Sequence, residues 1–285
     1  GDLILPENSQ NTISNFDAAD IIISSPVTLT GGSLALFTDT ANSITLNNPA
    51  NDFTGTVSVT QGGNVTLFDA NALSLGASTV SGNLLLQTGG AITQTGALTV
   101  AGTTGITAGA NDITLADAAN DFTGAVSIVS GKDVNLRDAN ALILGATTAS
   151  GGLTLQSGGA ITQTGTLSVS GTTGITAGAN DITLSNAAND FTGAVSIVSG
   201  KDVSLKDSTG GITIGSSNVS GNLTVDYRSN AGGITLAGTI TKDSGADATL
   251  TFWSFGTILL DENSAIKATS GKLNTVLRTD TDIDG

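Results

Sequence analysis

The feature that most constrains this chain is a long segment that occurs twice without a change. The segment NDFTGAVSIVSGKDV occupies positions 120–134 and returns at 189–203, and a looser copy, NDFTGTVSVTQGGNV, begins at Asn51. The similarity extends further, because the sequence at 89–121 reappears with few changes at 158–190. A fixed period, here of about 69 residues, is typical of a repeat architecture in which each unit contacts mainly its neighbours.

Within one period, short apolar and polar alternations such as AVSIV, DITL and GLTL are separated by Gly, Asn, Asp and Ser. These segments predict about nine short strands per period, which divide into three coils of about 23 residues in an all-β parallel β-helix. Taking Val126, Leu153, Ile175 and Val195 as equivalent positions gives coils of unequal length. At one strand spacing per coil, the chain makes about 12 coils and a rod of roughly 55–60 Å.

Repeated side chains predict the packing of this solenoid. The aliphatic residues of the repeated segment are expected to point inward and to stack from coil to coil: Val126, Ile128, Val134, Leu136, Val195, Ile197, Val203 and Leu205. Phe53, Phe122 and Phe191 recur at one point of the period and are expected to fill a wider corner. Asn51, Asn120 and Asn189 recur beside them, and we expect them to cap turns by bonding to their own backbone.

The period also divides the chain into regions. We expect irregular N-terminal coils or a cap at 1–50, then repeats at 51–119, 120–188 and 189–257, the last of them degenerate in its C-terminal part. Residues 258–285 are expected to form a further coil that continues in a longer parent chain.

Composition excludes several functional classes. A formal charge of −15, with neither Lys nor Arg before Lys132, makes nucleic acid an improbable partner because it repels phosphate backbones. Without Cys and Met the chain has no disulfides, no thiolate metal sites and no easily oxidised side chains. No apolar run approaches the roughly 18 residues of a membrane helix.

The segments GGAITQTGALTVAGTTGITAGANDITLADAANDFTGAVSI (89–128) and GKLNTVLRTDTDIDG (271–285) resemble the repeat regions of filamentous haemagglutinin-like proteins, which are secreted by the two-partner route in Gram-negative bacteria. The resemblance covers about residues 45–285. It implies a right-handed parallel β-helical shaft that passes an outer-membrane transporter during export and serves as a surface adhesin or extracellular fibre.

Some β-helical proteins are enzymes that cleave polysaccharides with clustered carboxylates and basic residues. The nearest such group in this chain recurs with the period: Lys132, Asp133, Arg137 and Asp138, then Lys201, Asp202, Lys206 and Asp207, with Asp69 at the same place in the first copy. Its recurrence favours a solvated turn with local ion pairs. We expect the chain not to be an enzyme and to need no cofactor.

Two non-repeated features remain. The segment DTDIDG at 280–285 places Asp280, Asp282 and Asp284 at the spacing of a calcium loop, but an acidic turn is the simpler interpretation. In the segment TLTFWSFGTILL, strand alternation puts Trp253 on the face opposite Phe252, so Trp253 is a candidate for an exposed aromatic contact, which Tyr227 and Arg228 would extend.

Together these features predict a non-catalytic structural shaft segment of a large bacterial surface adhesin or fibre, secreted or held at the surface of a Gram-negative cell. The expected partners are flanking coils or other copies, and cell-surface glycans or proteins. The first alternative is a subunit of a self-assembling extracellular filament, since an open coil end is a template for stacking. A carbohydrate-active β-helix protein is a more distant alternative.

Overall fold

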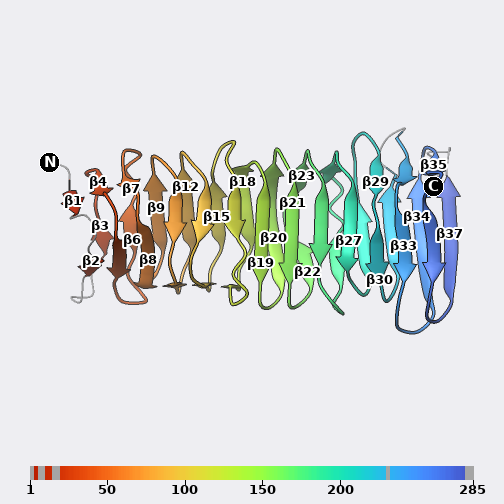
Figure 1. Cartoon of the computed structure of the whole chain (residues 1–285), viewed down its shortest axis with the longest axis horizontal. Coiled ribbons are helices and arrows are strands. Elements are labelled where there is room, and N and C mark those ends of the chain that lie inside the picture. The colour runs from red at the N-terminus through yellow and green to blue at the C-terminus, as the bar shows by residue number, and fades with distance from the viewer. Residues whose placement is uncertain (1–2, 6–9, 15–19, 229–231, 280–285) are drawn as a thin grey trace. The chain divides into compact units, whose positions relative to one another are not determined.

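A computed structural model of the chain describes residues 3–5, 10–14, 20–228 and 232–279. Every regular element in these residues is a β-strand, and no helix occurs among them. Two compact units, Gly1–Ala139 (unit 1) and Asn140–Gly285 (unit 2), are described separately (Figure 1). Each unit is a parallel β-solenoid, and the two contain about 12 turns in total. The predicted all-β parallel β-helix is thereby confirmed.

Unit 1 has two long groups of hydrogen-bonded strands and two short ones. The first long group is β2 (Gln10–Ser14), β5 (Ser33–Phe37), β8 (Thr56–Gln61), β10 (Leu73–Leu75), β13 (Ile92–Gln94), β16 (Ile113–Leu115) and β19 (Val134–Asp138). The second is β3 (Ile21–Ile22), β6 (Ile44–Leu46), β9 (Val65–Asp69), β12 (Leu84–Thr88), β15 (Thr104–Thr107) and β18 (Val126–Gly131). The short groups are β1 (Leu3–Leu5), β4 (Val27–Leu29) and β7 (Asp52–Phe53), and β11 (Ser78–Val80), β14 (Leu98–Val100) and β17 (Asp121–Phe122).

Unit 2 follows the same plan. One long group is β21 (Leu153–Ser157), β24 (Thr173–Thr176), β27 (Val195–Ser199), β29 (Ile212–Ile214), β32 (Ile234–Leu236) and β35 (Ile258–Leu260). The other is β20 (Leu142–Ala149), β22 (Ile161–Gln163), β25 (Ile182–Leu184), β28 (Val203–Lys206), β31 (Leu223–Tyr227), β34 (Ala248–Ser254) and β37 (Leu273–Thr279). The short strands are β23 (Leu167–Val169) and β26 (Asp190–Phe191), beside the second half of β20, and β30 (Ser217–Val219), β33 (Thr239–Lys242) and β36 (Ala265–Ala268).

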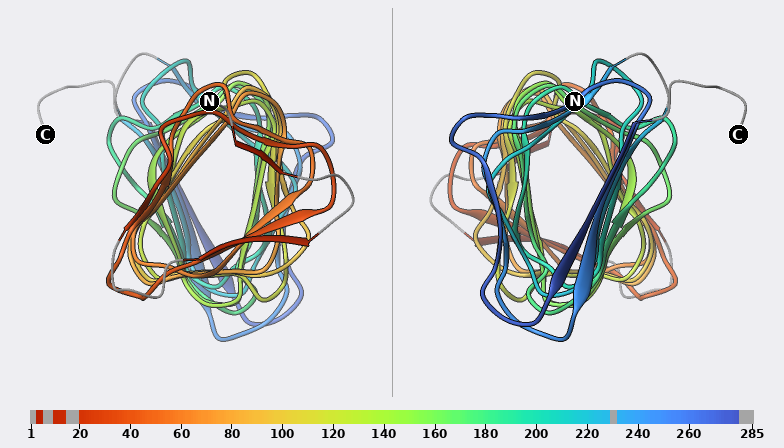
Figure 2. Two further views of the ribbon diagram at one scale, coloured as in Figure 1. Left: turned by 90° about the vertical axis from the view of Figure 1, so that its left-hand side faces the viewer. Right: turned by 90° about the vertical axis from the view of Figure 1, so that its right-hand side faces the viewer.

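Alternation along each strand builds the core. In β9, β12 and β34, every second side chain is buried and the others lie on the outer face. Figure 2 looks along the strands' stacking direction, and in each unit the turns wind around an interior that the inward side chains fill. All eight aliphatic residues of the repeated segment that were predicted to point inward are buried. Burial of these aliphatic layers, together with the backbone ladder between turns, holds each unit together.

Turn length varies along the chain. In unit 1 the turn from Thr56 to Ser74 is shorter than the turn from Leu3 to Val27. Unit 2 varies more widely, from the short turn between Leu142 and Ile161 to the long one between residues 223 and 250. The differences in turn length lie in the segments that connect the strands, because the side chains of the paired strands keep alternating between the inner and the outer face.

The predicted equivalence of Val126, Leu153, Ile175 and Val195 is wrong at two residues. Val126 lies in β18, which does not belong to the group of strands that contains Leu153 (β21) and Val195 (β27), and Ile175 is out of register. Leu153 pairs with Thr173, and Thr173 pairs with Val195, whereas Ile175 pairs with Leu155 and Ile197. The sequence-based alignment therefore displaced Ile175 by two positions. Alternation with a period of two does not distinguish registers that differ by two, because both keep the same side chains inside.

The sequence repeat is longer than three turns of the solenoid. Three turns of unit 1 lead from Val65 through Leu84 and Thr104 to Val126. The next copy of Val65 in the sequence is Val134, which lies further along the chain than Val126. Equivalent residues of successive repeats consequently fall in different groups of strands, since Val65 lies in β9 of the second long group and Val134 in β19 of the first.

The verbatim segment contains an irregularity at the same place in both copies. In unit 1, Ile106 pairs with Ile128 but Thr107 pairs with Ser130, so that Val129 is an extra residue, a β-bulge. The same shift in unit 2 makes Val198 the extra residue. Both valines point to solvent, with 63% and 57% of their surface exposed.

The repeated phrase GITAGAND forms a turn that requires glycine. Gly109 and Gly178 have φ angles of 59° and 58°, a backbone conformation that side chains with a Cβ rarely adopt. Asn111 and Asn180 close the turn by donating from the side-chain amide to the carbonyls of Ala108 and Ala177, at 2.8 and 2.9 Å. Both copies of the phrase keep this glycine and this asparagine because the geometry of the turn depends on them.

Candidate functional site

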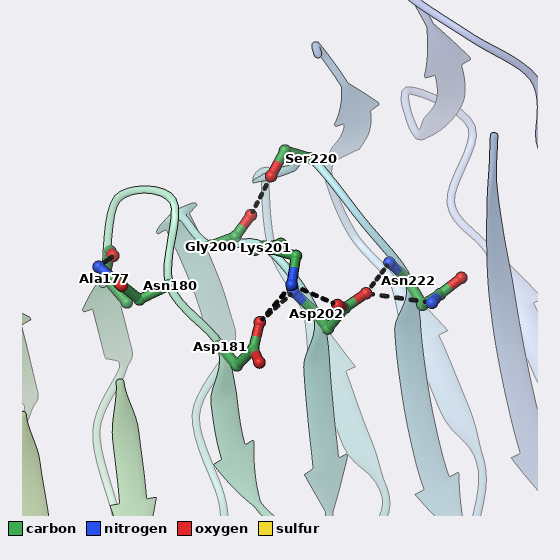
Figure 3. A network of polar contacts seen from close by, with 8 residues as sticks. All are labelled: Ala177, Asn180, Asp181, Gly200, Lys201, Asp202, Ser220 and Asn222. Atoms are coloured by element: carbon green, nitrogen blue, oxygen red, sulfur yellow. Dashed lines mark hydrogen bonds and ion pairs between the residues drawn. The ribbon is translucent and has the colours of Figure 1, made fainter. Parts of the chain in front are cut away.

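The charged turns of the repeat carry local ion pairs, as predicted. In unit 2, the Lys201 ammonium lies 3.4 Å from Asp181 and 3.2 Å from Asp202 (Figure 3). In unit 1, Lys132 lies 3.6 Å from Asp112 and 3.1 Å from Asp133. All of these side chains are about half exposed, and exposed pairs of this kind contribute little to stability because water and salt screen them.

The carboxylates of these turns also link one coil to the next. The backbone N–H of Asp202 donates to Asp181 Oδ1 at 3.3 Å, and the backbone N–H of Asn222 donates to Asp202 Oδ1 at 2.8 Å (Figure 3). The Asn222 backbone hydrogen bond, assisted by Lys201 and opposed by partial burial, lowers the pKa of Asp202. An aspartate just before a strand therefore accepts a hydrogen bond from a backbone N–H of the next coil. This is a structural role.

Asp69, Asp138 and Asp207 lie inside the solenoid, contrary to the prediction of a solvated turn. Their side chains are buried, and each accepts a backbone amide from the phenylalanine of its own repeat, Phe53, Phe122 or Phe191. Burial, only partly offset by these hydrogen bonds, raises the pKa of Asp69 and of Asp207 to about 6. The three phenylalanines are buried as well, so that each copy of the repeat holds a buried phenylalanine and aspartate pair.

Asn51, Asn120 and Asn189 do more than cap their own turns. Asn120 donates to the nearby Leu115 carbonyl, as predicted, and also accepts the Leu98 amide of the preceding coil at 2.9 Å. Its amide and that of Gln94 exchange two hydrogen bonds, at 2.8 and 2.9 Å. Asn189 repeats this arrangement with Leu167 and Gln163. These buried asparagines tie successive coils together.

The aromatic segment places one aromatic side chain in the core and one on the outer face of β34. Phe252 is buried and Trp253 lies on the outer face, as alternation predicts. Tyr227 does not extend that surface, because it is fully buried and continues the inward alternation of β31. Arg228 does extend it: the guanidinium carbon lies 4.0 Å from the centroid of the Trp253 ring.

Trp253 belongs to a row of paired positions whose other members are charged. Lys206, Asp226, Trp253 and Arg278 occupy paired positions on β28, β31, β34 and β37. Arg228 donates to both carboxylate oxygens of Asp226, at 2.8 and 2.9 Å, and Lys206 lies 3.6 Å from that carboxylate. These cations hold the pKa of Asp226 below its ordinary value, although burial acts in the opposite direction. A hollow of about 430 Å³ adjoins the group.

Sequence reasoning missed Lys242, which is fully buried in unit 2. Its ammonium donates to the carbonyls of Ser244, Gly245 and Ser270, at 2.7, 3.2 and 2.8 Å. The signal was present, because Lys242 has the same strand parity as the buried Ile240. Its three donors satisfy carbonyls of two neighbouring turns, so its role is to hold those turns together.

The predicted calcium ligands Asp280, Asp282 and Asp284 lie outside the described residues. Within the described ranges, no three His, Cys, Asp or Glu side chains gather closely enough to hold a metal ion. The same ranges contain no helix with the length and apolar character needed to cross a membrane.

Fold and site together define a repeat protein of the parallel β-solenoid class, whose recurring polar residues join coil to coil. The chain belongs to the family described as repeats of unknown function (DUF5649), whose sequence model matches residues 8–60, 62–129 and 131–198. The starts of the second and third matched segments, at positions 62 and 131, are separated by one period of the sequence. No curated protein and no solved structure matches the chain.

Proposed function

We propose that this chain is a non-catalytic structural segment, a shaft that supports other parts of a bacterial surface adhesin or fibre. The observation that carries the proposal is the coil-to-coil stacking of one repeated module. Aliphatic layers, buried asparagines and paired phenylalanine and aspartate residues recur with the period, and each joins neighbouring turns. Such a solenoid can be lengthened by copying a repeat without designing a new core.

The resemblance to filamentous haemagglutinin-like repeats supports the cellular part of the proposal. We place the protein outside a Gram-negative cell, secreted or held at the surface after passage through an outer-membrane transporter. Its partners are then flanking coils of the same chain, and cell-surface glycans or proteins. The absence of cysteine and methionine suits an oxidising exterior.

Protease treatment of intact cells of the native host tests this placement. An antibody against the repeat should detect the protein on intact cells or in the medium, and external protease should remove the signal while a cytoplasmic marker persists. Protection from protease until the cells are lysed would reject a surface location.

A second candidate is a subunit of a self-assembling extracellular filament. It is favoured by the last coil that the structure describes, where Leu260 and Leu277 are 44% and 45% exposed. Their register partners in the preceding coil, Leu236 and Phe252, are fully buried. An aliphatic layer of this kind, beside strand edges that no described residue pairs with, is a template for another coil.

Negative-stain electron microscopy across a concentration series separates the two candidates. Discrete particles of constant length support the shaft. Fibres that lengthen with concentration, and that disappear in a Leu260→Lys, Leu277→Lys variant, support the filament. Repeating the series with calcium tests the remaining hypothesis about Asp280, Asp282 and Asp284.

We further propose that the carboxylates of the repeat have no catalytic role, against the more distant alternative of a carbohydrate-active enzyme. Asp181 and Asp202 accept amides from the following coil, and both are paired with Lys201. Incubation with acidic and neutral polysaccharides should release no new reducing ends. Release that is lost in a Lys201→Gln variant would overturn this assignment.

A further inference from the structure

We propose that the hollow beside Trp253 binds an acidic saccharide, through one sugar ring that carries a carboxylate. The hollow has a volume of about 430 Å³, within the range of roughly 300–1,000 Å³ that is usual for small-molecule sites. It belongs entirely to unit 2, on and beside β31, β34 and β37. The residues that line it are Arg228, Trp253, Ser254, Leu277, Arg278 and Thr279.

The first argument is local charge. Lys206 and Arg228 pair with the carboxylate of Asp226, and Arg278 lies beside Trp253, so these four charged side chains carry a net charge of about +2 at neutral pH in a chain whose formal charge is −15. Asp226 is already engaged by Lys206 and Arg228. Arg278 makes no ion pair with any residue that the structure describes, and its guanidinium carbon lies 5.7 Å from the Trp253 centroid.

The second argument is the chemistry of the side chains. A guanidinium presents parallel N–H donors that match a carboxylate, which assigns Arg278 to the acid group of the ligand. Trp253 supplies an apolar surface next to it. Thr279 adds a hydroxyl at the rim, suited to the hydroxyl groups of a sugar.

The third argument concerns size and total charge. The cationic group is confined to a few neighbouring coils of unit 2, and the chain as a whole is strongly acidic, so a long polyanion would be repelled beyond its first contact. A sugar ring with one carboxylate can pair with the cationic group without approaching the acidic remainder of the chain. The site is independent of the proposed structural role, and either proposal can fail while the other stands.

Trp253 makes the test direct, because it is the only tryptophan in the chain. Its fluorescence should change and saturate when the purified full chain is titrated with methyl β-D-glucuronide. Methyl β-D-glucoside, which lacks the carboxylate, and acetate, which lacks the ring, should each produce a much smaller change. An equal response to the glucoside, an equal response to acetate, or no response to the glucuronide would overturn the proposal.

Variants test the residue assignment. Arg278→Gln should weaken glucuronide binding by about tenfold or more, because it removes the charge and the paired donors, and Arg278→Lys should have an intermediate effect. Lys267→Gln is the matched control, since it removes an exposed cation from the same coil but not from the hollow, and it should leave the titration unchanged. If both Gln variants weaken binding equally, the effect is one of general charge and the site assignment is wrong.

Discussion

At the scale of single residues, the buried polar side chains supply hydrogen bonds to the backbone that an apolar residue cannot replace. Asn120 accepts the Leu98 amide and donates to the Leu115 carbonyl, both of which are buried. Asn120→Ala would leave these backbone groups without partners and open a small cavity, at a cost of about 2–4 kcal/mol in the free energy of unfolding.

Urea unfolding followed by circular dichroism measures this loss. Thr93→Ala is the matched control, because Thr93 lies in unit 1 on the outer face of β13 and is exposed. The control should change the free energy of unfolding by less than about 0.5 kcal/mol. Equal effects of the two substitutions would contradict the role assigned to Asn120.

The buried aspartates predict an unusual dependence of stability on pH. Burial raises the pKa of Asp69 and of Asp207 from an ordinary 3.8 to about 6 in the folded chain. Between about pH 4 and pH 6 the folded chain therefore holds protons that the unfolded chain has released, and the free energy of unfolding falls as pH rises. We expect the protein to resist urea better at about pH 4.5 than at about pH 7.5.

The double variant Asp69→Asn, Asp207→Asn isolates this contribution. An asparagine keeps the oxygen that accepts the Phe53 or Phe191 amide but cannot ionise, so the difference between the two pH values should shrink. Asp243→Asn, at an exposed position, should leave the difference as it is. An unchanged difference in the double variant would show that other groups cause the dependence.

At the scale of the strand, the alternation of apolar and polar residues predicts which aliphatic side chains are buried, but it does not by itself predict which charged side chains are buried with them. It placed Val126, Ile128 and the other repeated aliphatic residues inside, and they are inside. Asp69 lies an even number of positions after the buried Val65, and Lys242 lies two positions after the buried Ile240, so alternation places both on the inner face. A charged side chain is ordinarily expected on the outer face. Backbone partners from neighbouring turns decide these cases, and those contacts are not visible in a single strand sequence.

The bulge in β18 provides a test of two adjacent residues. Ile128 is fully buried, whereas its neighbour Val129 is the extra residue that the register shift leaves exposed. Ile128→Ala should lower the free energy of unfolding by about 2–5 kcal/mol, and Val129→Ala should change it by less than about 0.5 kcal/mol. Urea titrations of both variants would decide, and comparable losses would show that the bulge is absent in solution.

At the scale of the whole molecule, the period itself can be tested by deletion. Removing residues 120–188 joins Ala119 to Asn189 and restores the local sequence AAND. Because each turn contacts mainly its neighbours, the shortened chain should still fold, with a cooperative transition and only a modestly lower urea midpoint.

A deletion that does not match the period is the control. Removing 120–153 joins Ala119 to Thr154 and brings together segments that are not equivalent, so this chain should lose its cooperative transition. If the two deletions behaved alike, the period would have no bearing on how the turns stack.

The sequence period is longer than three turns of the solenoid, and this difference in length has a consequence for recognition of the protein by antibodies. In unit 1, β8 and β18 carry equivalent residues, Val57 and Val126, yet they belong to different groups of strands. Related outward side chains are thus presented in different directions by successive copies. An antibody that recognises both copies in unit 1 would find its epitope on more than one side of that unit, so masking a single side of the unit would not hide the antigen.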